Sequence, residues 1–226
     1  MIEVVFIRHP ETEGNVLTNS EMAKLPRPNH LFTLSNKGVG ELEAVCAHMR
    51  QTMHYPPRAI FHSTAYRTRV LAHAISREHR VLEIIEDSRL NEKWDGIFHS
   101  LPEDEIKQRY PEQIEQRNKY GWYHYVPLGG ENGPAVEMRI RSFFRDLGEN
   151  QDYHGGKVVI VGHGNWFHLF EGIARRQTWD QVEQERRENP VPNCSISIYK
   201  FEPPNFFKMI KNRLVTSEDL ASPKYA

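Results

Sequence analysis

The chain has 226 residues, of which 38% are hydrophobic and 26% are charged, and its formal net charge is −1 at pH 7. A sequence of this length and composition is typical of a globular protein and excludes wholesale disorder. Because the charge is nearly balanced, there is no general attraction to nucleic acid or to an anionic membrane, and any anion has to be recognised by a local cluster of cationic side chains.

No stretch reaches the roughly 18 apolar residues that a membrane-spanning helix needs. The first residues run directly into a strand pattern, with no leader-like block before it. We therefore expect a cytoplasmic protein with neither a membrane nor a nucleic acid as its partner. Cys46 and Cys194 stand among apolar neighbours, which predicts buried, reduced thiols and not a disulfide or a metal site.

Short apolar runs that end in polar residues recur along the chain, as is typical of buried parallel strands. Apolar residues at helical spacing lie between them, at 42–53 and 136–147. This alternation predicts an α/β fold with three layers, α/β/α, around a mostly parallel central sheet. The predicted strands of the parallel part are 3–7, 59–62, 81–85 and 157–161, and two late strands are predicted at 195–201 and 206–210.

Two segments interrupt the alternation. Ser100–Glu103 (SLPE) has the pattern of a capping box, which predicts the start of a helix and, with the polar helical sequence that follows, an insert of about residues 97–130 over the carboxyl edge of the sheet. Residues 16–33 form a long loop that predicts a lid or a functional loop. We expect one domain over residues 1–215 and a mobile tail at 216–226.

The polar residues that directly follow the predicted strands make up a set suited to phosphoryl chemistry. They include two arginines, Arg8 and Arg67, two histidines, His9 and His163, and the carboxylic acid Glu92. Ligands of open α/β sheets bind outside the carboxyl ends of the strands, so these side chains should converge. Guanidinium groups bind phosphate oxygens through paired hydrogen bonds. Imidazoles attack phosphorus or donate a hydrogen bond, and a carboxylic acid protonates a leaving oxygen.

Five motifs in order resemble those of the histidine phosphatase, or phosphoglycerate mutase-like, superfamily. Residues 8–15 (RHPETEGN) resemble its R-H-G-x-T-x-x-N signature, and residues 63–67 (STAYR) resemble its S-x-x-x-R element. Residues 90–96 (LNEKWDG), 130–131 (GE) and 162–164 (GHG) resemble its L-x-E-x-x-x-G, G-E and H-G elements. The segment before the G-E element is similar to a plant and fungal branch, and the order of all five supports the family more than any one does.

The resemblance implies that His9 is the nucleophile and carries the phosphoryl group as a covalent intermediate. It implies that Arg8, Arg67 and His163 hold the phosphoryl oxygens. Glu92 is then the acid that protonates the leaving alkoxide and later activates water. The expected reaction is hydrolysis of a phosphomonoester on a small metabolite, with no metal and no cofactor.

Four further residues are expected to bind substrate on the same grounds. Thr12 and Asn15 lie in the first motif, and Asn15 either bonds the phosphate or orients the loop of the nucleophile. The Gly164 amide stands at the start of a predicted helix and suits an anion, whereas Glu131 suits binding and structural roles equally. Pro10 departs from the family's usual glycine and removes one backbone donor close to the nucleophile.

Alternative functions stay open at this level. A cofactor-dependent phosphoglycerate mutase uses the same intermediate, although the chain lacks the W-R-R stretch and the loop that we associate with mutases. A non-catalytic, phosphate-binding regulatory module is a second alternative, encouraged only by Pro10. A protein phosphatase is a third, and it needs a pocket that is not covered by residues 16–33 and 102–128. The oligomeric state is not predicted.

Overall fold

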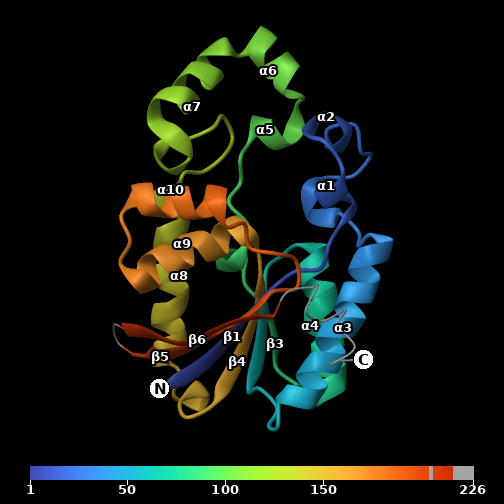
Figure 1. Cartoon of the computed structure of the whole chain (residues 1–226), viewed down its shortest axis with the longest axis vertical. Helices are drawn as coiled ribbons and strands as arrows, with labels where there is room; N and C mark the ends of the chain where they lie inside the picture. The colour runs from blue at the N-terminus through green and yellow to red at the C-terminus, as the bar shows by residue number, and fades with distance from the viewer. Residues whose placement is uncertain (204–205, 216–226) are drawn as a thin grey trace.

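The computed structural model describes residues 1–203 and 206–215, so the predicted tail at 216–226 lies outside the described residues. Within this part of the chain a six-stranded sheet has the order β3–β2–β4–β1–β5–β6 (Figure 1). Neighbouring strands from β3 to β1 are parallel, whereas β5 is antiparallel to β1 and β6. The strands are β1 (Ile2–Arg8), β2 (Ala59–His62), β3 (Ile84–Glu86), β4 (Lys157–Gly162), β5 (Ile196–Glu202) and β6 (Phe206–Val215).

Helices cover both faces of the sheet, which confirms the predicted three layers. Helices α3 (Asn36–Thr52) and α4 (Tyr66–His79) lie on one face, and α8 (Gly133–Glu149) and α9 (Gly164–Arg175) lie on the other (Figure 1). Helix α10 (Trp179–Glu188) packs on α9. The shorter elements are α1 (Glu13–Val16), α2 (Asn19–Met22), η1 (Asn29–Leu31), η2 (Ser88–Leu90), α5 (Ile97–Ser100), α6 (Glu103–Arg109), α7 (Pro111–His124) and η3 (Gln151–Tyr153).

The apolar run of β1 is continuous because both of its faces are buried. Val4 and Phe6 belong to the core between the sheet and helices α8 and α9, while Val5 and Ile7 belong to the core under α3 and α4. Successive side chains of a strand point to opposite faces, so a strand covered on both sides needs apolar residues at every position. Among the described residues, none of the helices combines the length and the apolar content needed to cross a bilayer.

The third predicted strand starts later than expected. Val81 is buried in the core under α3 and α4, but it lies in the turn that follows α4 and not in a strand. Helix α4 ends at His79, the C-cap Arg80 has a left-handed φ of 54°, and the Val81 amide donates to the Ser76 carbonyl. This hydrogen bond resembles a helix C-cap, where an apolar residue packs back on the helix that it follows. The strand β3 begins only at Ile84.

The helical insert is present, but its predicted cap is wrong. The N-cap of α6 is Pro102, with no side-chain hydrogen bond to the first turn. Ser100 is itself the last residue of α5, so its backbone is helical and it cannot also take the extended conformation of an N-cap. The elements α5, α6 and α7 rise beyond the carboxyl ends of the parallel strands (Figure 1).

Phe143 tests how far the packing of α8 stabilises the fold. Its ring is 1% exposed and meets the edge of Phe61 from β2 at 5.3 Å between centroids. We expect Phe143→Ala to lower the free energy of unfolding by about 3–5 kcal/mol, because the deleted ring leaves a cavity. Met138→Ala on the same helix, where Met138 is 74% exposed, should change it by less than about 0.5 kcal/mol. Urea unfolding followed by circular dichroism measures both, and similar losses would contradict this packing.

Candidate active site

A cavity of about 230 Å³, which we call the catalytic cavity, lies at the carboxyl edge of the parallel strands. It collects side chains from the carboxyl end of β1, from α4, from the loop after η2, from α9 and from the short elements α1, α2, η1 and α5. Six of the nine predicted site residues line it. The lining residues are Arg8, His9, Thr12, Gly14, Asn15, Met22, Asn29, Phe32, Arg67, Glu92, Lys93, Trp94, His99 and Asn165.

His9 directly follows β1 and is 4% exposed. Its Nδ1 lies 2.7 Å from the Pro10 carbonyl oxygen, which can only accept, so Nδ1 carries the proton and Nε2 keeps its lone pair. Burial lowers the pKa of His9 well below its ordinary value, and the nearby charges of Arg67 and Arg8 lower it further. The imidazole is therefore neutral at pH 7, with a nucleophilic nitrogen. Because this hydrogen bond uses a backbone carbonyl, the proline at position 10 does not prevent it.

His163 follows β4 and lies behind the catalytic cavity, with its ring centroid 5.2 Å from that of His9. Its Nε2 is 2.7 Å from the Ser63 hydroxyl, and its Nδ1 is 3.4 Å from Arg67 Nη2. A guanidinium group only donates, so Nδ1 accepts and Nε2 donates to Ser63. Burial, followed by the charge of Arg67, lowers the pKa of His163 well below its ordinary value. The two imidazoles thus converge, as the strand-end argument predicts.

Two guanidinium groups supply the positive charge of the cavity. Arg67 is 6% exposed and donates to the Asn29 carbonyl at 2.9 Å and to Asn29 Oδ1 at 3.3 Å. Burial lowers its pKa to about 10. Arg8 donates through Nη1 to the Val191 carbonyl, while its buried Nε has no hydrogen-bond partner among the described residues. Buried donors of this kind call for an anion, and a phosphate provides the oxygens that they lack.

Glu92 lines the cavity and is held by backbone amides. Its Oε1 accepts from the amides of Trp166 at 2.8 Å and Lys93 at 2.9 Å, and its Oε2 accepts from the Asn165 amide at 3.0 Å. Two of these donors belong to the first turn of α9, where unpaired N–H groups and the helix dipole favour a carboxylate. The first turn of α9 therefore binds the carboxyl group of the protein itself.

The four predicted substrate-binding residues fall into two groups. Thr12 and Asn15 line the cavity, and Asn15 Oδ1 accepts from the Thr12 amide at 2.9 Å and from its hydroxyl at 3.0 Å. Gly164 begins α9 but is not among the described residues that line the cavity. Glu131 is not among them either, because it pairs with Arg139 at 2.7 Å and accepts from the Trp94 amide at 3.1 Å.

Glu131 instead holds the loop that carries Glu92. Its partner Arg139, on α8, donates through Nη1 to the Arg89 carbonyl at 2.7 Å and through Nη2 to the Glu92 carbonyl at 3.2 Å. The ion pair is largely buried, with 17% and 25% of the two side chains exposed. Glu131 of the G-E motif, through Arg139, therefore fixes the position of the loop that carries Glu92.

Some site residues were missed in the sequence. Asn29 lies in the loop at 16–33, whose length was the only signal, and Asn193 donates to the His9 carbonyl at 2.9 Å. An asparagine between prolines and a strand gives a weak signal, since such residues usually serve turns. Trp94 and His99 also line the cavity. Within residues 1–203, no cluster of three or more His, Cys, Asp or Glu side chains has the arrangement of a metal site.

The lowered pKa of His9 predicts a pH-dependent stability. Below its ordinary pKa of 6.5 the unfolded imidazole takes up a proton while the folded one does not, so the free energy of unfolding falls as the pH falls. We expect His9→Asn to remove about 1.4 kcal/mol of this fall per pH unit below 6.5. The exposed His73, replaced in the same way, should leave the fall as it is. Urea titrations at pH 5, 6 and 7 measure it, and identical curves for His9→Asn and the unsubstituted chain would contradict a buried neutral imidazole.

Comparison with known proteins identifies the family of the chain. The family model of the histidine phosphatase superfamily (branch 1) matches residues 4–211. A phosphoglycerate mutase-like protein, AT74 of Arabidopsis thaliana, is 26% identical over 204 residues, which are 83% of this chain and 61% of that protein, so the chain spans less than two thirds of this relative. Phosphoserine phosphatase 1 of Hydrogenobacter thermophilus is 24% identical over 167 residues, which are 72% of this chain and 71% of that protein.

Solved structures share the fold. The crystal structure of the α-ribazole phosphatase from Shigella flexneri superposes with a TM-score of 0.72 at 18% identity and covers 92% of this chain and 94% of its own. At this identity the likeness concerns the fold alone. The motif order, the fold and the match of the family model over nearly the whole chain lead to one conclusion: the chain belongs to branch 1 of the histidine phosphatase superfamily.

Proposed function

We propose that the protein is a metal-independent phosphomonoester hydrolase that acts on a small phosphorylated molecule through a phosphohistidine at His9. The observation that carries the proposal is the neutral imidazole of His9, with its Nε2 lone pair free, at a cavity that Arg8, Arg67 and Glu92 also line. A nucleophile, two cationic oxygen ligands and an acid in one small cavity are the groups that phosphoryl transfer requires.

In the first step Nε2 of His9 attacks phosphorus, and the bond from phosphorus to the ester oxygen breaks. The guanidinium groups of Arg8 and Arg67 bind the phosphoryl oxygens and stabilise their charge. Glu92 takes part in this step in its protonated form: it gives its proton to the leaving oxygen, so that the alcohol departs neutral and Glu92 is left as the carboxylate that its backbone amides favour. His163 lies behind the cavity with both ring nitrogens engaged by Ser63 and Arg67, so it acts on the phosphoryl oxygens only by positioning the guanidinium group of Arg67.

In the second step a water molecule attacks the phosphohistidine, and Glu92 takes the proton of that water. The bond between phosphorus and Nε2 breaks, inorganic phosphate leaves, and His9 returns to its neutral form. The three amides on Glu92 fix its carboxyl group for both proton transfers. The hydrogen bond from Nδ1 to Pro10 keeps the ring in one orientation through the cycle.

Hydrolysis and mutase activity share the first step and differ in the second acceptor. The names of the relatives cover both reactions, since one is called phosphoglycerate mutase-like and another a phosphoserine phosphatase. The missing W-R-R stretch supports the hydrolase. Release of phosphate from 3-phosphoglycerate, compared with its conversion to the 2-isomer, separates the two, and faster isomerisation would exclude the hydrolase.

Removing the nucleophile tests the proposal directly. We expect His9→Ala to lower kcat/KM for phosphomonoesters by at least about a thousandfold, because the covalent route is lost. Rapid acid-free quenching with a labelled substrate should trap one acid-labile phosphoryl group on the unsubstituted chain and none on the variant. His73→Ala replaces an exposed histidine of α4 and should retain both activity and labelling. Labelling that persists in His9→Ala would assign the nucleophile elsewhere.

Ligand effects give a second test. Activity should persist in the presence of a chelator, since no step uses a metal ion. Vanadate should inhibit in competition with substrate, because a five-coordinate oxyanion fits a cavity that binds the phosphoryl group in its transition state. Inhibition constants for the unsubstituted chain and for Arg67→Lys, which loses the forked donor, should differ by about tenfold or more. Loss of activity with the chelator, or indifference to vanadate, would contradict the mechanism.

A further inference from the structure

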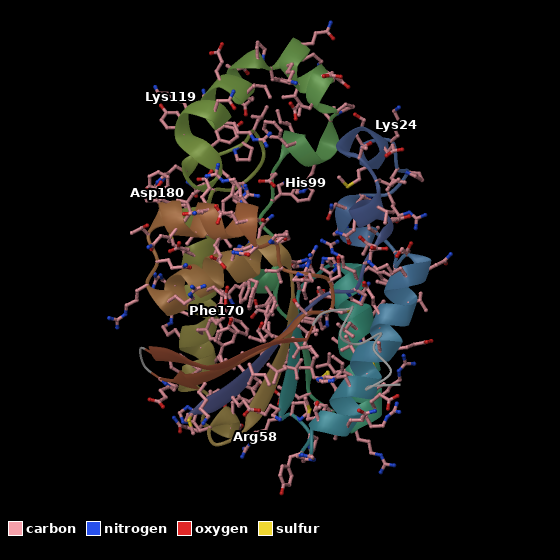
Figure 2. The ribbon with its side chains drawn as sticks, viewed as in Figure 1. Lys24, Arg58, His99, Lys119, Phe170 and Asp180 are labelled. Atoms are coloured by element: carbon pink, nitrogen blue, oxygen red, sulfur yellow. The ribbon has the colours of Figure 1, made fainter. Side chains whose placement is uncertain are left out.

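A second cavity, of about 390 Å³, adjoins the catalytic cavity, and we call it the outer cavity. The two share walls formed by Met22, Asn29, Phe32, Trp94 and His99. Figure 2 shows His99, which belongs to α5 of the insert, beyond the end of the sheet. A substrate whose phosphoryl group lies in the catalytic cavity therefore places the rest of its structure in the outer cavity. The volume is in the range, about 300–1,000 Å³, that small ligands occupy.

The chain order agrees with this placement. Glu92, which protonates the leaving oxygen in the proposed function, lies two residues before Trp94. Trp94 borders both cavities, so the first atoms beyond the ester oxygen pass its side chain. The outer cavity is thus the site of the alcohol part of the substrate.

The walls of the outer cavity are formed mainly by apolar and aromatic side chains. The indole of Trp94 and the imidazole of His99 lie with centroids 4.9 Å apart and planes tilted by 40°. Trp94 is 39% exposed, so part of its ring is available to a ligand, while Phe32 is 4% exposed and closes the inner end. Flat apolar walls favour a flat ring, which stacks on an indole and loses contact with water. The apolar lining consists of Met22, Ala23, Leu25, Pro26, Pro28, Phe32 and Trp94.

Charged groups of the outer cavity are already engaged. Arg27 is the only formal cation among its described lining residues, and its Nε lies 3.5 Å from Glu13 Oε1. The backbone carbonyl and Oδ1 of Asn29 accept from Arg67. Burial lowers the pKa of His99, so its ring is neutral at pH 7. A second phosphate or a carboxylate would have to compete with Glu13 for Arg27, and no other formal cation is found among the described residues of these walls.

Lys93 borders the catalytic cavity but is engaged as well. Its side chain is 1% exposed, and its ammonium group is paired with Asp95. The same group lies 5.2 Å from the ring centroid of Trp122. Recruiting Lys93 to a second anion would break an ion pair in a buried place, which is costly. The ammonium group of Lys93 is therefore engaged within the protein and does not select a doubly anionic substrate.

We propose that the substrate is a phosphomonoester whose alcohol part ends in a flat, uncharged ring, held in the outer cavity against Trp94. Molecules with a second phosphate or a carboxylate near the ester, such as phosphoglycerate, are disfavoured by the same walls. This inference rests on the proposed function and names the class of substrate for that reaction.

Three substrates separate the ring from other effects. Benzyl phosphate and 2-hydroxyethyl phosphate both release an uncharged primary alcohol, and only the first carries a flat ring, whereas 3-phosphoglycerate adds a carboxylate. We expect kcat/KM for benzyl phosphate to exceed that for 2-hydroxyethyl phosphate by about tenfold or more, with 3-phosphoglycerate the poorest. Equal values for the first two, or a preference for 3-phosphoglycerate, would overturn the inference.

Variants locate the selection in the outer cavity. Trp94→Ala should lower the ratio of kcat/KM for benzyl phosphate to that for 2-hydroxyethyl phosphate by about fivefold to tenfold. Trp179→Ala is the matched control, because Trp179 is 44% exposed on α10 and lines neither cavity. It should leave the ratio as it is. A ratio that Trp94→Ala does not change would place the ring elsewhere and overturn the inference.

A gain of charge tests the same walls independently of Trp94. Met22→Lys places an ammonium group where the two cavities meet. It should raise kcat/KM for 3-phosphoglycerate relative to benzyl phosphate by about tenfold. An unchanged ratio would count against the placement of the alcohol part.

The two proposals fail in different ways. Phosphate release from none of the three substrates contradicts the proposed function and the inference together. Release from all three at similar kcat/KM retains the proposed function and overturns only the inference. Release with the expected order, lost selectively in Trp94→Ala, supports both.

Discussion

Two buried guanidinium groups beside a neutral imidazole are the constraint on which the site depends. Burial lowers the pKa of both Arg8 and Arg67, and Glu92 is the charge that most opposes this effect for each. Burying a positive charge is unfavourable unless an anion pairs with it. Burial keeps His9 unprotonated, and the same charges add to this effect, because a third cation beside them would be still less favourable. One electrostatic arrangement thus selects an anionic ligand and preserves the nucleophile.

The surroundings hold this arrangement through backbone contacts as much as through side chains. Cys194 donates its amide to the Arg8 carbonyl and Asn193 donates to that of His9, so the turn before β5 fixes the end of β1. On the other side of the loop, a Cβ at Gly38 would come within 1.9 Å of the Glu11 carbonyl oxygen. The loop after β1 therefore packs directly on the start of α3. A site built this way is ordered before the ligand arrives, which favours catalysis by a preformed set of dipoles.

The chemical groups and the selecting groups come from different parts of the fold. Arg8, His9 and His163 stand at or just after the ends of central strands, where register fixes their positions. The walls of the outer cavity come from the segment at 22–32, from Trp94 just before the insert and from His99 within it. Segments outside the sheet can change without disturbing the strands, so one arrangement for phosphoryl transfer can serve many alcohols.

The strand ends show how much the sequence determined. Apolar runs followed by Arg8-His9 and by Gly162-His163 predicted buried parallel strands and a shared polar edge, because burial on both faces demands continuous apolar residues. The family, the layers and the convergence of both histidines followed from that pattern and from the order of the motifs. The pattern placed the start of β3 too early, at Val81. This residue is buried just after a helix, and apolar spacing does not distinguish the end of a helix from a strand.

Only the tertiary structure decided which polar groups reach the cavity. The sequence offered Glu131 as a ligand of the substrate, yet its pairing with Arg139 depends on α8 lying beside the loop of Glu92. Asn29 and Trp94 are brought to the site by contacts between segments that are distant in sequence. Local propensity fixes the elements, because it acts between neighbours along the chain. The direction of a side chain at a loop is set by packing against residues far away, which no spacing of motifs records.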